Sequence, residues 1–332
     1  MIIHLKSSVG EAKALDLAQE LEAIHLFNGS FSTLVTPNAY RKLAPQYEPF
    51  VDAFFPMDSD MQLSNRTYLD RTRTVNWGTK TIGGDSQNCV VIAGPCSIES
   101  QEQITQSAEL LVSLGIGTLR AGCYKPRTSP YSFQGLGLEG LKMLAKVREK
   151  YGLNIITEVK DSTHVQDVID YTDIVQVGAK AMYDQSILKA CGKARKPILI
   201  KRGFGSTLQE FVQASEFVLS GGNEQVVLCE RGIRTFETKT RFTLDLCGAA
   251  YLKHYTNLPV VLDPSHAMGY AYGVPDLSKA CMAMGVEGLL IEVHPNPKVA
   301  KSDASQQLDH SEFTELFGQL QQVAKAVGRQ VI

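Results

Sequence analysis

Several patterns that are typical of membrane, secreted or low-complexity proteins are missing. No apolar run approaches the ~18 residues that a membrane-spanning helix needs. The opening residues MIIHLKSSVG lack the basic-then-apolar layout of a signal peptide. Low-complexity segments are absent as well. We therefore expect a cytoplasmic protein that has no membrane partner.

A strong charge imbalance is missing too. The chain has 33 Lys and Arg against 35 Asp and Glu, which gives a formal net charge of −2. Such a chain has no global field that would attract nucleic acid, and we expect no such partner. Its 332 residues suffice for an α/β barrel of roughly 250 residues with a small additional domain.

The cysteines do not form a pattern. There are seven of them, scattered, with no C-x-x-C pair, which argues against a disulfide framework and a four-cysteine zinc site. Cys96 differs from the others because it follows a strand-like apolar run that ends at Gly94-Pro95. Four others lie in apolar stretches and are expected to be buried thiols, namely Cys191, Cys229, Cys247 and Cys281.

Residues 1–57 form a unit of their own. The expected elements are strands at 2–5, 24–27, 31–36 and 50–55, and helices at 11–23 and 38–47. This β-α-β-β-α-β order is typical of a ferredoxin-like α+β domain. Residues 58–82 are polar and arginine-rich, and we expect a linker with an added strand around 74–77.

Residues 83–332 alternate strand-like runs with helical stretches eight times. The strands are nearly continuous in apolar residues, which indicates a parallel sheet buried on both faces. Eight βα units close a (β/α)8 TIM barrel, so an open doubly wound sheet is the second choice. The expected strands are 89–93, 117–121, 154–159, 173–178, 197–202, 225–229, 259–263 and 287–293. The expected helices are 102–114, 138–150, 162–170, 184–191, 207–220, 238–254, 275–284 and 311–327.

Polar residues follow every predicted strand, where a TIM barrel carries its chemistry. The first, seventh and eighth strands are neighbours once the barrel closes, and they are followed by Cys96, His266, Glu292 and Asp303. A thiolate, an imidazole and two carboxylates make a mixed site for a divalent transition metal. A nucleophilic cysteine would instead need a histidine base and an oxyanion hole. We therefore interpret Cys96 as a metal ligand.

Positive residues come from the second, fourth, fifth and sixth strands and the loops that follow them. They are Arg120, Lys125, Arg127, Lys180, Lys201 and Arg231. Six cations in one desolvated opening of the barrel require anions that neutralise their charge. Phosphate and carboxylate groups suit them best. A single charged or polar residue at the end of a strand, such as Glu158 or a lone histidine, more often has a structural role or is exposed to solvent. The predicted metal ligands and the positive residues gather on opposite sides of the barrel opening, and this separation indicates a functional site there.

A series of segments carries a family resemblance. In chain order they are GPCSIES, LRAGCYKPRTSPYSFQGLG, VQVGAK, ILIKRGF, LCERGIRTFE, VVLDPSHAMG, LLIEVHPNP and SDASQQL. They resemble 3-deoxy-D-arabino-heptulosonate 7-phosphate (DAHP) synthase, in particular the short bacterial type I branch with an N-terminal ferredoxin-like domain. The match runs through residues 88–328. GPCS alone is a weak signal, whereas KPRTSPYSFQGLG followed by CERGIRTFE and DPSH is highly specific.

The resemblance implies a metal-dependent, aldol-like condensation of phosphoenolpyruvate with erythrose 4-phosphate. The products are DAHP and phosphate, on the shikimate route to chorismate and the aromatic amino acids. It implies one divalent ion, Mn²⁺, Fe²⁺, Co²⁺ or Zn²⁺, on Cys96, His266, Glu292 and Asp303. The expected phosphoenolpyruvate contacts are Arg120, Lys125, Lys180, Lys201 and Arg231. The expected tetrose phosphate contacts are Arg127, Thr128, Ser129 and Asp263. The expected catalytic groups are Lys125 as proton donor, Glu158 for the water, and the ligands Cys96 and His266.

Two departures from the family pattern leave alternatives open. Lys180 stands where an arginine is expected, which keeps the charge but loses the bidentate fork. Residues 267–272 lack the basic residue expected after the glycine that follows DPSH. The alternatives are 3-deoxy-D-manno-octulosonate 8-phosphate synthase and a non-catalytic sensor of metal and sugar phosphate. The KPRT segment argues against the first, and the complete ligand set with Lys125 argues against the second.

The resemblance also concerns residues 1–57. It implies a regulatory domain that senses tyrosine or phenylalanine, within a homotetramer. No predicted ligand lies before Cys96, which agrees with a domain outside the catalyst. The alternative is that the domain only shields the surface of the barrel.

Overall fold

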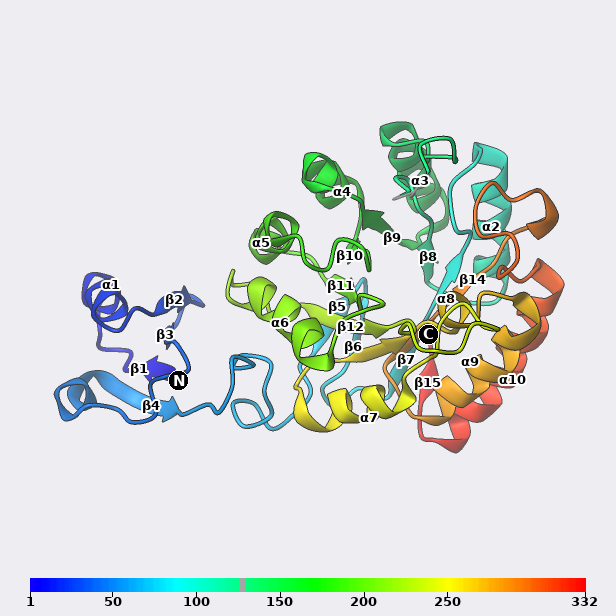
Figure 1. Cartoon of the computed structure of the whole chain (residues 1–332). Helices are drawn as coiled ribbons and strands as arrows, with labels where there is room; N and C mark the ends of the chain where they lie inside the picture. Colours follow the sequence, from blue (N-terminus) through cyan, green and yellow to red (C-terminus); the bar gives the residue numbers. More distant parts are fainter. Residues whose placement is uncertain (126–128) are drawn as a thin grey trace.

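The computed structural model describes residues 1–125 and 129–332. A ring of helices surrounds a closed barrel, and a small sheet lies to one side of it (Figure 1). The predicted TIM barrel with a small ferredoxin-like α+β unit is confirmed. Within the described part of the chain, no helix combines the length and the apolar character that crossing a membrane would require.

The small sheet comes from the first residues of the chain. Its strands are β1 (Ile2–Leu5), β2 (Ile24–Phe27), β3 (Ser32–Val35) and β4 (Val51–Phe55), in the antiparallel order β2-β3-β1-β4. Because successive strand residues face opposite sides, Ile3 packs with helix α1 (Glu11–Glu20), whereas Ile2 joins the barrel's cluster of buried residues. The sheet therefore has an apolar face on each side.

The expected helix at 38–47 is wrong. A short 3₁₀ helix, η1, covers Pro45–Phe50 instead, and it leads directly into β4. Proline has no backbone N–H, so Pro45, inside the expected helix, cannot donate the i to i−4 bond of an α-helix. The β-α-β-β-α-β order thus keeps its strands but has a short 3₁₀ helix in place of the second α-helix.

The barrel strands match the expected eight runs. They are β7 (Asn88–Gly94), β8 (Thr118–Arg120), β9 (Asn154–Val159), β10 (Ile174–Val177), β11 (Ile198–Lys201), β12 (Val226–Glu230), β13 (Val260–Leu262) and β14 (Gly288–Glu292). All are parallel, and pairing of β14 with β7 closes the ring. The outer helices are α2 (Gln101–Ser113), α3 (Leu138–Tyr151), α4 (Val165–Tyr171), α5 (Gln185–Lys193), α6 (Leu208–Leu219), α7 (Leu246–Tyr255), α9 (Val274–Ala283) and α10 (His310–Ala326).

Several details differ from expectation. The predicted helix 238–254 begins too early, because α7 starts at Leu246 and residues 233–245 form a loop in which Ile233 pairs with Thr243. The short helix α8 (Pro264–Met268) and the strand β15 (Gln330–Val331), which pairs with β7, were not expected. Cys247 is exposed rather than buried.

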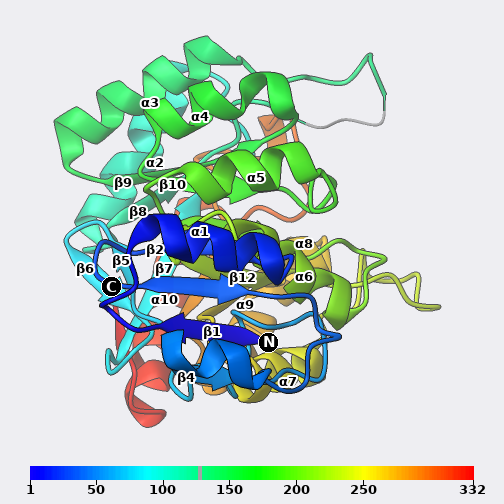
Figure 2. The same ribbon diagram turned by 90° about the vertical axis from the view of Figure 1, so that its left-hand side faces the viewer.

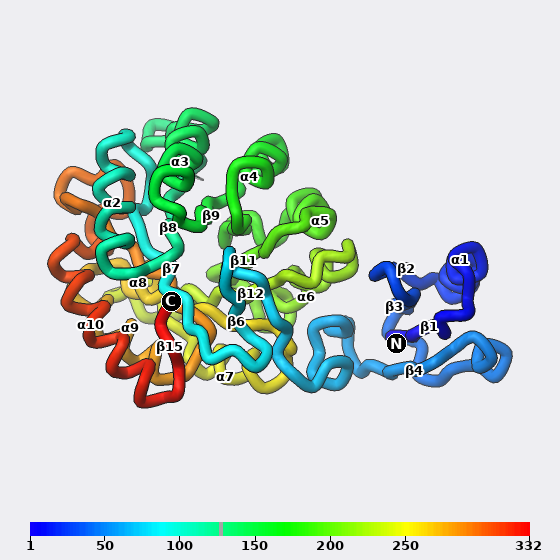
Figure 3. The backbone as a smooth tube through the Cα atoms, turned by 180° about the vertical axis from the view of Figure 1, so that it is seen from behind, coloured from blue at the N-terminus to red at the C-terminus, as the bar shows by residue number. Residues whose placement is uncertain are grey.

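A hairpin covers the amino-terminal end of the barrel. The expected strand near 74–77 is present as β5 (Val75–Trp77), and it pairs with β6 (Lys80–Ile82). Trp77 is buried against the inward-facing strand residues, and its Nε1 donates to Thr118 Oγ1 at 2.9 Å. Seen from behind, the hairpin lies on the same side as the C-terminus (Figure 3). This end of the barrel is therefore filled.

The segment between the sheet and the hairpin is bonded to the barrel. Glu216 of α6 accepts from the backbone N–H of Leu63 at 3.1 Å, and from Ser64 N and Oγ at 2.9 and 2.6 Å. Burial raises the pKa of this carboxyl, although the bonds from Ser64 and Leu63 oppose the shift. Asn257 Nδ2 donates to the carbonyl oxygens of Leu63 and Asn65. The domain boundaries at 57 and 82 stay predictions.

We expect Glu216→Gln to destabilise this junction. The amide has one acceptor and one donor, so its NH₂ must face a backbone N–H that the carboxylate accepted from. Leaving that group unpaired should lower the free energy of unfolding by about 1–3 kcal/mol in urea denaturation. The same change at Glu149, an exposed residue of α3, is the control. Equal stability of both variants would contradict the assignment.

Candidate active site

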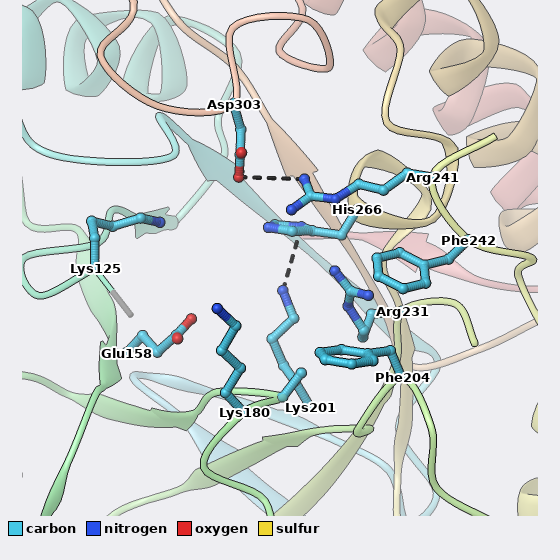
Figure 4. Close-up of a pocket in the computed structure, with 11 residues that line it drawn as sticks. Lys125, Glu158, Lys180, Lys201, Phe204, Arg231, Arg241, Phe242, His266 and Asp303 are labelled. Atoms are coloured by element: carbon cyan, nitrogen blue, oxygen red, sulfur yellow. Dashed lines mark hydrogen bonds and ion pairs between the residues drawn. The ribbon is translucent and has the colours of Figure 1, made fainter. Parts of the chain in front are cut away.

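A pocket of about 220 Å³ lies where the carboxyl ends of the strands meet. The loops that follow the strands project from this side of the barrel, opposite the C-terminus (Figure 2). The pocket is lined by Lys125, Glu158, Ala179, Lys180, Lys201, Phe204, Arg231, Arg241, Phe242, His266 and Asp303 (Figure 4). Cationic and acidic side chains thus share one small cavity.

Three predicted metal ligands converge at one edge of the pocket. One ligand atom from each of Cys96, Glu292 and Asp303 lies within 4.8 Å of the others. Cys96 Sγ is 3.3 Å from Asp303 Oδ2. Gly94 ends β7 at φ 139°, and a Cβ there would lie 2.2 Å from the carbonyl oxygen of Arg120. Only glycine fits this approach, after which the chain turns to place Cys96.

The predicted fourth ligand, His266, lies beside this group. Asp263 directly follows β13 and caps α8, because its Oδ1 accepts from the His266 backbone N–H at 3.0 Å. Its Oδ2 is 2.8 Å from His266 Nδ1, and His266 Nε2 is 3.4 Å from Glu292 Oε1. Burial lowers the pKa of His266. A neutral ring that donates from Nδ1 to Asp263 leaves Nε2 as a metal-binding atom.

The charges of these groups fit a divalent cation. Burial raises the pKa of the Cys96 thiol to about 12, and Glu292 adds to this rise. Burial also opposes ionisation of Glu292, but His266 and Arg120 outweigh it and lower its pKa. The thiolate is the form that binds a metal, and coordination to a divalent cation deprotonates a thiol that burial alone keeps protonated. A thiol, an imidazole and two carboxylates are the donor set that a divalent transition metal takes.

The opposite side of the pocket is cationic. Arg231 is buried, and its Nε and Nη1 have no hydrogen-bond partner among the described residues. Its guanidinium carbon lies 4.4 Å from the centre of the Phe242 ring. Lys201 Nζ is 2.6 Å from Asp263 Oδ2, and Lys180 also lines the cavity. Buried donors without partners indicate a site for an anion.

Lys125 and Glu158 lie between the two sides. Lys125 Nζ is 3.0 Å from the Cys96 carbonyl oxygen and 3.1 Å from Cys96 Sγ. Burial opposes the charge of Lys125, but Cys96 and Glu158 outweigh it, so its pKa is raised. Glu158 Oε2 accepts from Gln176 Nε2 at 2.8 Å. A protonated amine and a carboxylate therefore face the same cavity.

Some predicted substrate contacts lie beneath the pocket or apart from it. Arg120 Nη1 donates to Glu292 Oε1 at 2.7 Å and to Pro95 O at 2.8 Å, so this arginine holds a predicted ligand. Asp263 is fully buried between Lys201 and His266. Ser129 accepts from Tyr131 N and does not line the pocket. Arg127 and Thr128 lie outside the described residues. Contacts of these residues with either substrate stay predictions.

The pocket lining also includes Phe204, Arg241 and Phe242, which no sequence pattern indicated. Arg241 Nη1 is 3.5 Å from Asp303 Oδ2, and the two phenylalanine rings stack with centroids 5.5 Å apart. The wrong helix prediction at 238–254 concealed two of them. Asp245 was the available signal, since its side chain accepts from Gly248 N and marks the true start of α7.

Comparison with known proteins identifies relatives of this site. The model of the DAHP synthetase I family matches residues 60–329. The phospho-2-dehydro-3-deoxyheptonate aldolase of Thermotoga maritima is 41% identical over 270 residues, covering 81% of this chain and 79% of its own. A 2-dehydro-3-deoxyphosphooctonate aldolase of Francisella tularensis subsp. holarctica is 31% identical over 264 residues, covering 73% and 95%.

Solved structures agree with this result. The crystal structure of the Thermotoga maritima DAHP synthase superimposes with a TM-score of 0.81 at 35% identity, covering 100% of this chain and 99% of that one. A truncated form of the same enzyme covers 81% of this chain and 98% of its own, with a TM-score of 0.76 at 37% identity. With the fold, the pocket and both matches in agreement, the chain belongs to the DAHP synthetase I family.

Proposed function

We propose that this pocket condenses phosphoenolpyruvate with erythrose 4-phosphate to give DAHP and inorganic phosphate, as a DAHP synthase of the shikimate pathway. The observation that supports this most is that a Cys, His, Glu and Asp group at the edge of the cavity, of which His266 and Asp303 line it, lies near an anion site on Arg231. The 41% identity to a phospho-2-dehydro-3-deoxyheptonate aldolase favours this substrate pair over that of the octonate enzymes, which are 31–35% identical.

We propose that Cys96, His266, Glu292 and Asp303 hold one divalent metal ion. The donor set supports a first-row transition metal, and supply and geometry decide among Mn²⁺, Fe²⁺, Co²⁺ and Zn²⁺. Such an ion, when bound, would supply Lewis-acid chemistry that polarises the aldehyde of the tetrose. Asp263 and Arg120 would keep His266 and Glu292 oriented for it.

The residues of the chain then bind, orient and exchange protons. Lys201 and Arg231, helped by Lys180, would hold the anionic groups of phosphoenolpyruvate and offset repulsion between the substrates. As C3 attacks the aldehyde carbon, Lys125 Nζ would give a proton to the oxygen that becomes a hydroxyl. Water ordered by Glu158 adds to C2, and cleavage of the C–O bond of the resulting hemiketal phosphate releases phosphate.

The test is phosphate release by the purified full-length chain with Mn²⁺ and each aldose phosphate. We expect turnover with erythrose 4-phosphate that chelator removes. Faster turnover with arabinose 5-phosphate would assign the chain to the octulosonate enzymes instead. Metal binding without turnover on either substrate would identify a sensor and overturn the proposal.

We further propose that residues 1–57 regulate the barrel in response to tyrosine or phenylalanine, within a homotetramer in the cytoplasm. The contact of Glu216 with residues 63 and 64 supports this, because it fixes the segment that directly follows the small sheet to α6, the helix after the strand that carries Lys201. An effector that changes this docking would shift the active population by about 1–3 kcal/mol of coupling. All seven cysteines are free thiols, which agrees with the cytoplasm.

Removal of residues 1–60 is expected to abolish inhibition by tyrosine or phenylalanine while the barrel keeps its activity. The truncated Thermotoga structure supports a barrel that folds alone. The cut retains residues 62–64, so the bonds to Glu216 remain. Rates measured while each amino acid, with tryptophan as control, is titrated into both forms provide the comparison. Equal inhibition of both forms, or none of the full-length chain, would refute regulation by this domain.

A further inference from the structure

The segment that carries Asp303 returns to the end of β14. Leu308 N donates to the carbonyl oxygen of Glu292 at 3.0 Å, and His294 N donates to that of Leu308 at 2.9 Å. Within the segment, Gln306 N donates to Asp303 O at 3.2 Å. Two consecutive glutamines, Gln306 and Gln307, are each 1% exposed. Their side chains are thus fixed beside the predicted metal ligands.

Gln306 joins two charged side chains of the site. Its Nε2 donates to Glu292 Oε2 at 2.7 Å, and its Oε1 accepts from Arg241 Nη1 at 2.7 Å. Arginine only donates hydrogen bonds, so it fixes which end of the amide faces it. The NH₂ group must therefore face Glu292. Gln306 thus holds Oε2 of Glu292. The other oxygen, Oε1, faces Arg120 and His266.

Gln307 acts on a second ligand, which comes from another strand. Its Oε1 accepts from the Cys96 backbone N–H at 2.9 Å, and its Nε2 donates to Ser302 O at 2.8 Å. Cys96 follows β7, whereas Glu292 ends β14. The 302–308 segment thus contacts two ligands of different origin through its glutamines and supplies the third, Asp303.

We propose that Gln306 is a positioning residue that sets the orientation of Glu292 for the metal. The proposal rests on the metal site proposed above. Removal of a residue that hydrogen-bonds to a metal ligand typically weakens metal affinity about 10- to 100-fold. A purely structural glutamine has different partners. Gln62, for example, bonds the amino group of Met1 and the carbonyl oxygen of Thr36, far from the site.

The test uses Gln306→Met, which conserves length and removes both polar atoms. In a titration of the metal-free full-length protein, we expect the Kd for Mn²⁺ to rise about 10- to 100-fold. At saturating Mn²⁺, kcat should return to within a few-fold of the unchanged protein, because the residue orients a ligand and touches no substrate. The rise in Tm on adding a fixed amount of Mn²⁺ should shrink accordingly.

The control is Gln62→Met, which also removes a buried glutamine with two hydrogen bonds and should leave the Kd for Mn²⁺ unchanged. If Gln306→Met does not fold, Gln306→Asn decides, since the shorter amide cannot reach Glu292 and Arg241 together and should also weaken Mn²⁺ binding. An unchanged Kd in the folded Gln306 variant overturns the role of Gln306. Failure of the unchanged protein to bind Mn²⁺ would instead refute the metal site itself.

Discussion

Cys96→Ser and His266→Ala are each expected to reduce metal-dependent turnover by roughly 100-fold or more while the barrel stays folded. Even groups one layer behind a ligand typically change metal affinity about 10- to 100-fold, so loss of a ligand should do more. Serine has nearly the size of cysteine, and a hydroxyl is a far weaker ligand for a transition metal than a thiolate. The rate at fixed Mn²⁺ and the bound metal per chain are the two measurements.

Folding and specificity need separate controls. Circular dichroism of each variant should match that of the unchanged protein, since Cys96 and His266 follow strand ends and lie outside the inner barrel core. Cys247→Ser changes an exposed thiol on α7 and should leave both measurements unaltered. Full activity of either site variant in the presence of chelator would show that these residues hold no essential metal.

The barrel was predictable because its signal is local. A strand buried on both faces must be apolar along its length, and β9 over 154–159 has the same bounds in the sequence reading and in the structure. The closing of eight such strands then brings the residues after β7, β13 and β14 together. The proximity of Cys96, Glu292 and Asp303 is thus a consequence of strand count and order.

The remaining features depend on contacts that no local pattern contains. Arg241 reaches the pocket from a loop whose charged and apolar residues also suit a helix, and only the cap at Asp245 separates the two readings. The two partners of Gln306 are Glu292, at the end of β14, and Arg241, in the loop before α7. These two residues are far apart in the chain. The prediction of a helix at 38–47 was wrong because the composition of this segment favours a helix, whereas Pro45 and Pro49 impose a 3₁₀ geometry.

Lys125→Ala is expected to lower kcat by about 10²- to 10⁴-fold and to change the KM for phosphoenolpyruvate much less. Loss of a proton donor that acts as bonds change reduces the rate by about this factor. Lys125 has the position for this role, because its Nζ lies 3.1 Å from Cys96 Sγ and faces the pocket. Its raised pKa, due to Cys96 and Glu158 against the opposing effect of burial, keeps the proton on Nζ at neutral pH.

A comparison of two substitutions separates charge from proton transfer. Lys125→Arg keeps the positive charge near Cys96 but offers a guanidinium that does not give up its proton. If Lys125 donates a proton, this variant should bind phosphoenolpyruvate nearly as the unchanged protein does and still have a low kcat. Lys142→Ala, at an exposed pair with Glu139 on α3, is the control and should alter neither constant. Two outcomes would contradict proton donation: a normal kcat in Lys125→Arg, or a change in KM alone in Lys125→Ala. Either one would mean that Lys125 only binds the anionic substrate through its charge.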